Sequence, residues 1–181
     1  LQYDGDLQLP KRFLVTPPAI KDTSGEWFSK AGLAQFACSE TQKFGHVTYF
    51  WNGNRSGKFA GETWQEVPSD VVPFEQRPWM KAAEIADAMI AALRSGQYKT
   101  LRCNFANGDM VGHTGDPKAA QKAVEMVDKC IGKLIPKFLA LKADVIITAD
   151  HGNADQMVDY DTGMVKTSHT LLPVECIYIA K

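Results

Sequence analysis

The sequence predicts an α/β layered sandwich with a largely parallel central sheet. Short apolar runs typical of strands alternate with longer segments whose apolar residues recur at helical spacing, which is the pattern of a parallel sheet with helical connections. The run at residues 144–149 is almost wholly apolar, as expected when helices cover both faces of a sheet. Two polar clusters begin where apolar strands end, which is where ligands bind in such folds.

Five strands are expected from runs rich in apolar, β-branched and aromatic side chains. They are residues 35–39, 46–51, 101–105, 144–149 and 174–180. Residues 2–18, rich in Asp, Gly and Pro, indicate an extended linker, within which residues 12–15 fit a further short strand.

Two helices are predicted in the first half of the chain. Residues 24–32 form one, with Ser24 as its N-cap and Gly32 as its stop. Residues 79–95 carry apolar side chains at helical spacing and end at Gly96.

A third helix is predicted to begin at Asp116, because Asp is a favoured N-cap and Pro117 suits the first helical position. Pro136 is expected to kink or end this helix, since proline lacks the amide hydrogen that a helix interior requires. The buried face is predicted to consist of Ala120, Val124, Val127, Ile131 and Leu134.

The overall composition is that of a globular protein of one-domain size. The 181 residues include 20 Lys+Arg and 21 Asp+Glu, a net charge of −1 that gives no general attraction for nucleic acid or an acidic membrane. No apolar run approaches the ~20 residues that cross a bilayer, and the start lacks the features of a signal peptide. A chain that begins at Leu1 is expected to be cut from a longer one. The widely spaced cysteines, without a CxxC pair, are expected to be reduced, which favours a cytoplasmic location.

Three polar clusters contain residue types that bind metal ions. Asp109 precedes His113 by four residues, and one helical turn there would direct both side chains to one side. Asp150 and His151 directly follow an apolar strand, and His169 lies just before the last strand. Two carboxylates and three imidazoles suit Mn²⁺ or Zn²⁺. Taken singly, each residue also fits a surface histidine or a turn-forming aspartate, so it is the three clusters together that favour a metal site.

Four segments resemble sequence motifs of the cofactor-independent phosphoglycerate mutases. Residues 107–115, Asn-Gly-Asp-Met-Val-Gly-His-Thr-Gly, are similar to the first metal motif of that family. Residues 148–154 and 167–170 resemble its second and third metal motifs, and residues 39–50 resemble its lysine-bearing segment. The opening residues 2–6 resemble the hinge between the two domains of the family. The resemblance runs in the expected order over nearly the whole chain and implies a fold shared with the alkaline phosphatases.

The resemblance also implies a pair of divalent ions, Mn²⁺ first, with Co²⁺ or Zn²⁺ tolerated, and no requirement for 2,3-bisphosphoglycerate. It assigns Asp109, His113 and His169 to one ion, and Asp150 and His151 to the other. It puts Lys43 against the phosphate in transfer, where a fixed cation balances developing negative charge.

The reaction that the resemblance implies is the interconversion of 3-phosphoglycerate and 2-phosphoglycerate in glycolysis, through a phosphoserine intermediate. The nucleophilic serine of the family lies in a Gly-Asn-Ser-Glu type segment that this sequence does not contain. On this resemblance, residues 1–18 are a hinge segment and residues 19–181 are the C-terminal part of the metal-binding phosphatase domain. The isolated chain is therefore expected to be inactive, and its expected partner is the missing N-terminal part of a monomeric parent.

Two other functions remain open from the sequence. A phosphopentomutase or phosphohydrolase of the same superfamily would use similar metal ligands, although the segment around Lys43 favours the phosphoglycerate mutase. A fragment that binds metal without catalysis is the second alternative, and the missing serine segment favours it. Arg102 lies in a predicted strand, where a buried carboxylate would be a natural partner, and no role in the site is assigned to it.

Overall fold

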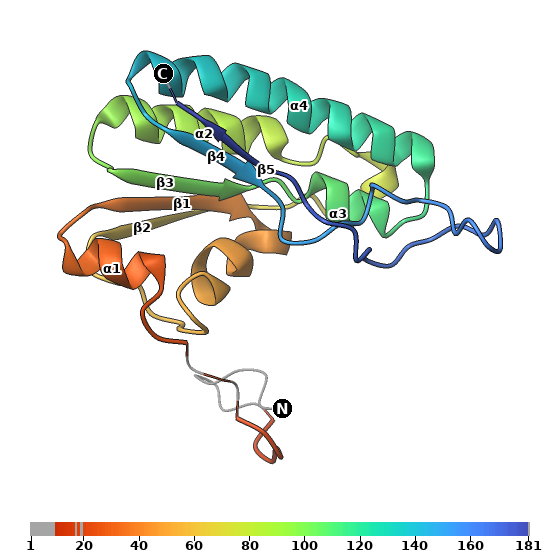
Figure 1. Cartoon of the computed structure of the whole chain (residues 1–181), viewed down its shortest axis with the longest axis horizontal. Coiled ribbons are helices and arrows are strands. Elements are labelled where there is room, and N and C mark those ends of the chain that lie inside the picture. Colours follow the sequence, from red (N-terminus) through yellow and green to blue (C-terminus); the bar gives the residue numbers. More distant parts are fainter. Residues whose placement is uncertain (1–9, 17, 19, 181) are drawn as a thin grey trace.

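The computed structural model describes residues 10–16, 18 and 20–180 of the chain, so the expected hinge at residues 2–6 lies outside the described residues. Figure 1 shows an α/β arrangement with a sheet between helical layers. The strands are β1 (Gln35–Glu40), β2 (Glu62–Val67), β3 (Thr100–Asn104), β4 (Val145–Thr148) and β5 (Cys176–Ile179). The helices are α1 (Ser24–Lys30), α2 (Ala82–Ser95), α3 (Asn107–Gly112) and α4 (Pro117–Ala140), with the short helical turns η1 (Thr41–Lys43), η2 (His46–Phe50) and η3 (Phe74–Gln76).

The first three strands form a parallel sheet in the order β2-β1-β3. Every residue of the central strand β1 is buried, since α2 covers one face of the sheet while α1 and η2 contact the other (Figure 1). The predicted fold class, an α/β layered sandwich with a parallel sheet, is confirmed.

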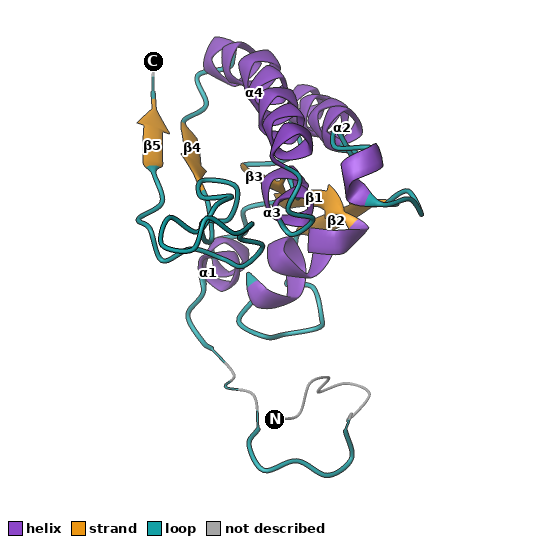
Figure 2. Ribbon diagram, turned by 90° about the vertical axis from the view of Figure 1, so that its right-hand side faces the viewer, coloured by secondary structure: helices purple, strands orange, loops and turns teal. Residues whose placement is uncertain are grey.

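Strands β4 and β5 form a separate two-stranded antiparallel sheet. Figures 1 and 2 place this pair alongside β3. The prediction that helices cover both faces of the apolar run is wrong for the described residues, because Ile146 is 68% exposed and alternate residues of β4 face solvent. This strand therefore has apolar side chains that no other described part of the chain covers.

Helix α4 begins as predicted. The carboxylate of Asp116 accepts hydrogen bonds from the amides of Lys118 and Ala119, at 2.9 and 3.1 Å, and thereby satisfies two amides of the first turn. Pro136 does not end the helix, which continues to Ala140, because the packing of the last turns compensates for the missing amide.

The predicted buried face of α4 is only partly correct. Ala120 and Leu134 are buried, but Val124 is 50% exposed. The buried side chains of this helix are Ala119, Ala120, Ala123, Cys130 and Leu134, so the small residues face α2 and α3 and allow close approach. The larger core cluster joins Cys130 and Leu134 to the apolar side of α2, where Ile85 has no exposure, whereas the three alanines pack in a second cluster with Met80 and Val111.

The prediction of a strand at residues 46–51 is wrong, since this segment forms the π-helical turn η2. The Thr48 hydroxyl donates to the carbonyl of Phe44 at 2.7 Å, and the amide of Asn52 donates to the carbonyl of Thr48 at 3.0 Å. β1 already pairs with β2 and β3, which leaves no edge for a further strand beside it. Two of the β-branched residues in this segment, Val47 and Thr48, are buried where η2 packs against the sheet.

Three smaller differences concern the first hundred residues. Residues 12–15 are not a strand, and the side chain of Leu14 is 99% exposed. The N-cap of α1 is Thr23 rather than Ser24, and its hydroxyl accepts from the amide of Glu26 at 3.3 Å. The edge strand β2 was not predicted, because four of its six side chains are polar and half of its residues are exposed, as an edge position permits.

Two further findings bear on the environment of the chain. Within the described residues, no helix combines the length and apolar character needed to cross a membrane. The four cysteines are free, and burial raises the pKa of the Cys38 thiol to about 11, which makes it a poor nucleophile.

Candidate metal centre

Most of the residues predicted from the sequence motifs follow the carboxyl ends of strands, and His169 precedes the antiparallel strand β5. Lys43 is in η1 directly after β1, and Asp109 is in α3 after β3. Asp150 and His151 follow β4, while His169 comes from the segment that leads back to β5. A carboxyl edge gathers loops that are distant in sequence, which brings these side chains to one place.

A single carboxylate oxygen lies at the centre of the group. Asp109 Oδ1 is 3.0 Å from His113 Nε2 and 3.0 Å from His169 Nε2, and these two nitrogens are 3.1 Å apart. Donors bound to one ion at about 2.0–2.2 Å are separated by about 2.8–3.6 Å for octahedral to tetrahedral angles. The three donor atoms therefore have the chemistry and the spacing that a divalent transition-metal ion requires.

The orientation of His113 is set by its other ring nitrogen. His113 Nδ1 lies 2.6 Å from the carbonyl oxygen of Thr167, which can only accept a hydrogen bond. The proton is thus assigned to Nδ1, and the lone pair of Nε2 faces Asp109 and His169. Such an outer hydrogen bond is the usual support of a metal-binding histidine.

His151 contacts His169, and Asp150 lies beside His151. His151 Nε2 is 3.6 Å from Asp150 Oδ2 and 3.9 Å from Asp109 Oδ1, and its ring stacks on that of His169 with 3.7 Å between centroids. Donor atoms of Asp109, His151 and His169 all fall within 4.8 Å of one another. The structure thus brings His151 of the second expected ligand set close to Asp109 and His169 of the first.

The second oxygen of Asp109 pairs with Lys43. Lys43 Nζ lies 2.5 Å from Asp109 Oδ2, and the lysine is 7% exposed. Burial favours the neutral acid and acts to raise the pKa of Asp109, but hydrogen bonds from Lys43 and Asn153, with the charge of Lys43, outweigh it and lower the pKa to about 2. The carboxylate is consequently ionised at neutral pH, as a metal ligand must be.

Asn153 is a further residue of the candidate centre, and the sequence motifs did not single it out. Its Nδ2 donates to Asp109 Oδ1 at 2.9 Å, and the side chain is 5% exposed. A Cβ added at Gly112 would lie 2.4 Å from Asn153 Oδ1, so only glycine allows this approach. The available signal was the position of Asn153 inside the motif at residues 148–154, two residues after His151.

Replacing Lys43 by Met in the metal-free chain is expected to destabilise the fold by on the order of 2 kcal/mol at neutral pH, since the pKa of Asp109 would lose its depression. A depressed folded pKa stabilises above the unfolded value, and the effect is lost as pH falls from about 4 toward about 2. Urea unfolding near pH 7 and near pH 3 measures the effect, with exposed Lys118→Met as control. A stability difference that is equal at both pH values would contradict this assignment.

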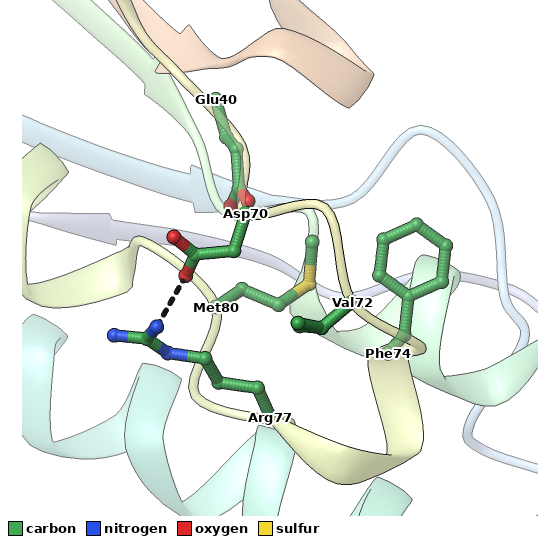
Figure 3. A pocket seen from close by; sticks show the side chains of 6 residues that line it. All are labelled: Glu40, Asp70, Val72, Phe74, Arg77 and Met80. Atoms are coloured by element: carbon green, nitrogen blue, oxygen red, sulfur yellow. Dashed lines mark ion pairs between the residues drawn. The ribbon is translucent and has the colours of Figure 1, made fainter.

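A small pocket lies apart from this group (Figure 3). Its lining residues are Glu40, Asp70, Val72, Phe74, Arg77 and Met80. Arg77 Nη1 and Asp70 Oδ2 form an ion pair of 2.9 Å within it, and burial raises the pKa of Glu40. None of the six belongs to the predicted metal ligands, so the pocket is separate from the candidate metal centre.

The chain is similar to curated phosphoglycerate mutases from several organisms. The 2,3-bisphosphoglycerate-independent phosphoglycerate mutase of Trypanosoma brucei brucei is 50% identical, over 96% of this chain and 34% of that protein. The enzyme of the same name from Vibrio cholerae is 46% identical, over 98% of this chain and 35% of that protein. The chain thus spans about a third of the length of the curated relatives that it matches.

A solved structure agrees with these relatives. Leishmania mexicana phosphoglycerate mutase, crystallised at low cobalt concentration, is 52% identical and superposes with a TM-score of 0.93, over 98% of this chain and 35% of that one. The resemblance inferred from the motifs is confirmed by these matches. The family model of the Metalloenzyme superfamily matches residues 5–181, and the chain belongs to that superfamily.

Proposed function

We propose that this chain contributes the metal-binding part of a 2,3-bisphosphoglycerate-independent phosphoglycerate mutase. The observation that carries the proposal is the carboxylate of Asp109, which contacts two imidazole nitrogens through one oxygen and a buried ammonium group through the other. In this proposal residues 1–18 are the hinge and residues 19–181 are the C-terminal part of the phosphatase domain. The similarity to the mutase of Trypanosoma brucei brucei supports the choice of substrate.

The ligand roles follow from the donor atoms. Asp109, His113 and His169 would hold one ion, and Asp150 and His151 would provide part of the shell of a second. Mn²⁺ suits this mixture of oxygen and imidazole donors, and Co²⁺ or Zn²⁺ accept the same donors. When bound, such ions neutralise the charge of a phosphate and activate an attacking oxygen.

Lys43 would act on the substrate rather than on the ions. Its ammonium group is held by Asp109, and its burial means that little water screens its charge. A phosphate oxygen that approaches the ions would therefore meet a fixed cation beside them, which stabilises the charge that develops during transfer.

The proposed substrates are 3-phosphoglycerate and 2-phosphoglycerate, with glycolysis in the cytoplasm as the setting and without 2,3-bisphosphoglycerate as a cofactor. The partner is the N-terminal part of the same protein, which would supply the serine and the remaining ligands. The parent protein is proposed to act as a monomer.

The purified 181-residue chain is expected to bind Co²⁺ or Mn²⁺ and to leave phosphoglycerates unchanged, because its sequence lacks the Gly-Asn-Ser-Glu type segment. Calorimetric titration measures binding, and a coupled assay measures interconversion. The full-length enzyme from Trypanosoma brucei brucei is the positive control for the assay. Phosphoglycerate turnover by the chain alone would contradict the expected inactivity, and absence of metal binding would contradict the site. Turnover of a pentose phosphate or an aryl phosphate would favour a phosphopentomutase or a phosphohydrolase.

A further inference from the structure

The two segments that carry His151 and His169 are joined at one point. The amide of Thr170 donates to the carbonyl of Gly152 at 2.9 Å, in an isolated antiparallel bridge. The hydroxyl of Thr170 donates to Asp155 Oδ2 at 2.8 Å, and Thr170 is 5% exposed. A hydrogen bond to an ionised carboxylate is stronger than one between neutral groups. We call this junction of Gly152, Asp155 and Thr170 the loop clasp.

The loop clasp is packed so closely that its residue types are restricted. A Cβ added at Gly152 would lie 2.1 Å from Thr170 Oγ1 and 2.7 Å from Asp155 Oδ2. The hydroxyl and the carboxylate thus rest directly on the backbone of the neighbouring segment. Because no side chain intervenes, the distance between the two segments is set by the clasp itself.

The clasp lies directly beside both histidines. Gly152 follows His151 and Thr170 follows His169, and the two imidazole rings stack at 3.7 Å with 22° between their planes. The chain between the segments is a hairpin closed by the bridge between Val158 and Val165, and its exposed side chains include Tyr160 at 83%. The tip of the hairpin is thus exposed, while Ala154 and Met157 at its base pack against the second core cluster. The clasp is the backbone contact that joins the two segments next to the histidines themselves.

We propose that Thr170, with Asp155 as its acceptor, is a positioning residue that holds His151 against His169 and thereby sets the separation of the two proposed ion positions. This inference rests on the proposed metal centre. Thr170 is not among the proposed ligands, and it acts through the histidines. Outer partners of this kind change metal affinity by about 10–100-fold when they are removed.

Thr170→Val tests the proposal, because valine keeps the shape of threonine and removes the donor. The full 181-residue chain is titrated with Co²⁺ by calorimetry, and the visible absorption of bound Co²⁺ reports the coordination geometry. We expect Thr170→Val to weaken Co²⁺ binding about tenfold or more and to change the Co²⁺ spectrum. Thr170→Ser, which keeps the hydroxyl, should restore both. Thr63→Val is the matched control, since Thr63 is exposed on β2.

The outcomes separate the two proposals. If the wild-type chain binds no Co²⁺, the metal centre fails and this inference fails with it. If the wild-type chain binds Co²⁺ and Thr170→Val binds it equally, with the same spectrum, the clasp has no positioning role while the metal centre stands. If Thr170→Val loses the far-ultraviolet circular dichroism of the folded chain, Asp155→Ala replaces it, because alanine removes the acceptor of the Thr170 hydroxyl. Unchanged Co²⁺ affinity and spectrum in Asp155→Ala would then overturn the inference, whereas a weaker affinity together with a changed spectrum would support it.

Discussion

Replacing Asp109 by Asn is expected to weaken Co²⁺ binding by more than about a hundredfold, which exceeds the loss for a residue outside the ligand set. The variant removes the only carboxylate that contacts both His113 Nε2 and His169 Nε2 among the described residues. It also leaves the ammonium group of Lys43 buried without its counterion, and an unpaired buried cation repels a nearby metal ion. Calorimetric titration of both chains measures the difference.

Asp128→Asn is the control for this prediction. Asp128 is exposed on α4, and its replacement by Asn changes the net charge of the chain by the same amount as Asp109→Asn. Thermal melts of both variants separate a loss of ligand from a loss of fold. Co²⁺ binding by Asp109→Asn within about tenfold of the wild type, in a folded chain, would show that Asp109 is not a ligand.

Replacing Arg102 by Ala is expected to destabilise the fold by about 3–5 kcal/mol, the usual cost of leaving a buried charge without its partner. Arg102 Nη2 lies 2.8 Å from Glu62 Oε1, and the side chains are 12% and 0% exposed. Arg102 Nε also donates to the carbonyl of Val47 at 2.8 Å, within the turn η2. The substitution therefore leaves the buried carboxylate of Glu62 without its ion-pair partner. It also removes the side-chain donor to the backbone carbonyl of Val47 in η2. Urea unfolding followed by circular dichroism measures the loss.

Two further variants make the assignment specific. Arg94→Ala, at an exposed position in the last turn of α2, should change stability by less than about 0.5 kcal/mol. The double variant Arg102→Met, Glu62→Gln should recover part of the loss, because it buries no charge. A loss for Arg102→Ala no larger than for Arg94→Ala would exclude a structural role for the ion pair.

Features that depend on neighbours in sequence could be predicted. Asp116 and Pro117 identify the start of α4, and Gly96 ends α2 in the left-handed conformation with a φ of 66°. The strand predicted at residues 46–51 failed because its composition reflects burial against the sheet, whereas pairing depends on which edges are free. Which sheet edges are free cannot be inferred from the residues of this segment alone.

For the candidate metal centre too, the residue types could be predicted from the sequence and the contacts between them could not. The motifs supply the types and the order of residues such as Asp109 and His169, and the structure brings these two within 3.0 Å. The supporting contacts could not be predicted, since Asn153 and Thr170 act through distances between segments that only the folded chain defines. The sequence suggested a buried carboxylate as the partner of Arg102, and the structure identifies it as Glu62. This pair could not be predicted, because β2 and β3 are brought together only by their pairing with β1.

The tight approaches at Gly112 and Gly152 have a consequence for how such proteins are recognised. Neither glycine offers a donor atom to an ion from a side chain, yet an added methyl group at either would come within 2.4 Å of a neighbouring oxygen. A homologous sequence with every aspartate and histidine intact but alanine at one of these two places would match the motifs nearly letter for letter. Its ligands would nevertheless be pushed out of alignment, so atomic clearance is part of what the motifs encode.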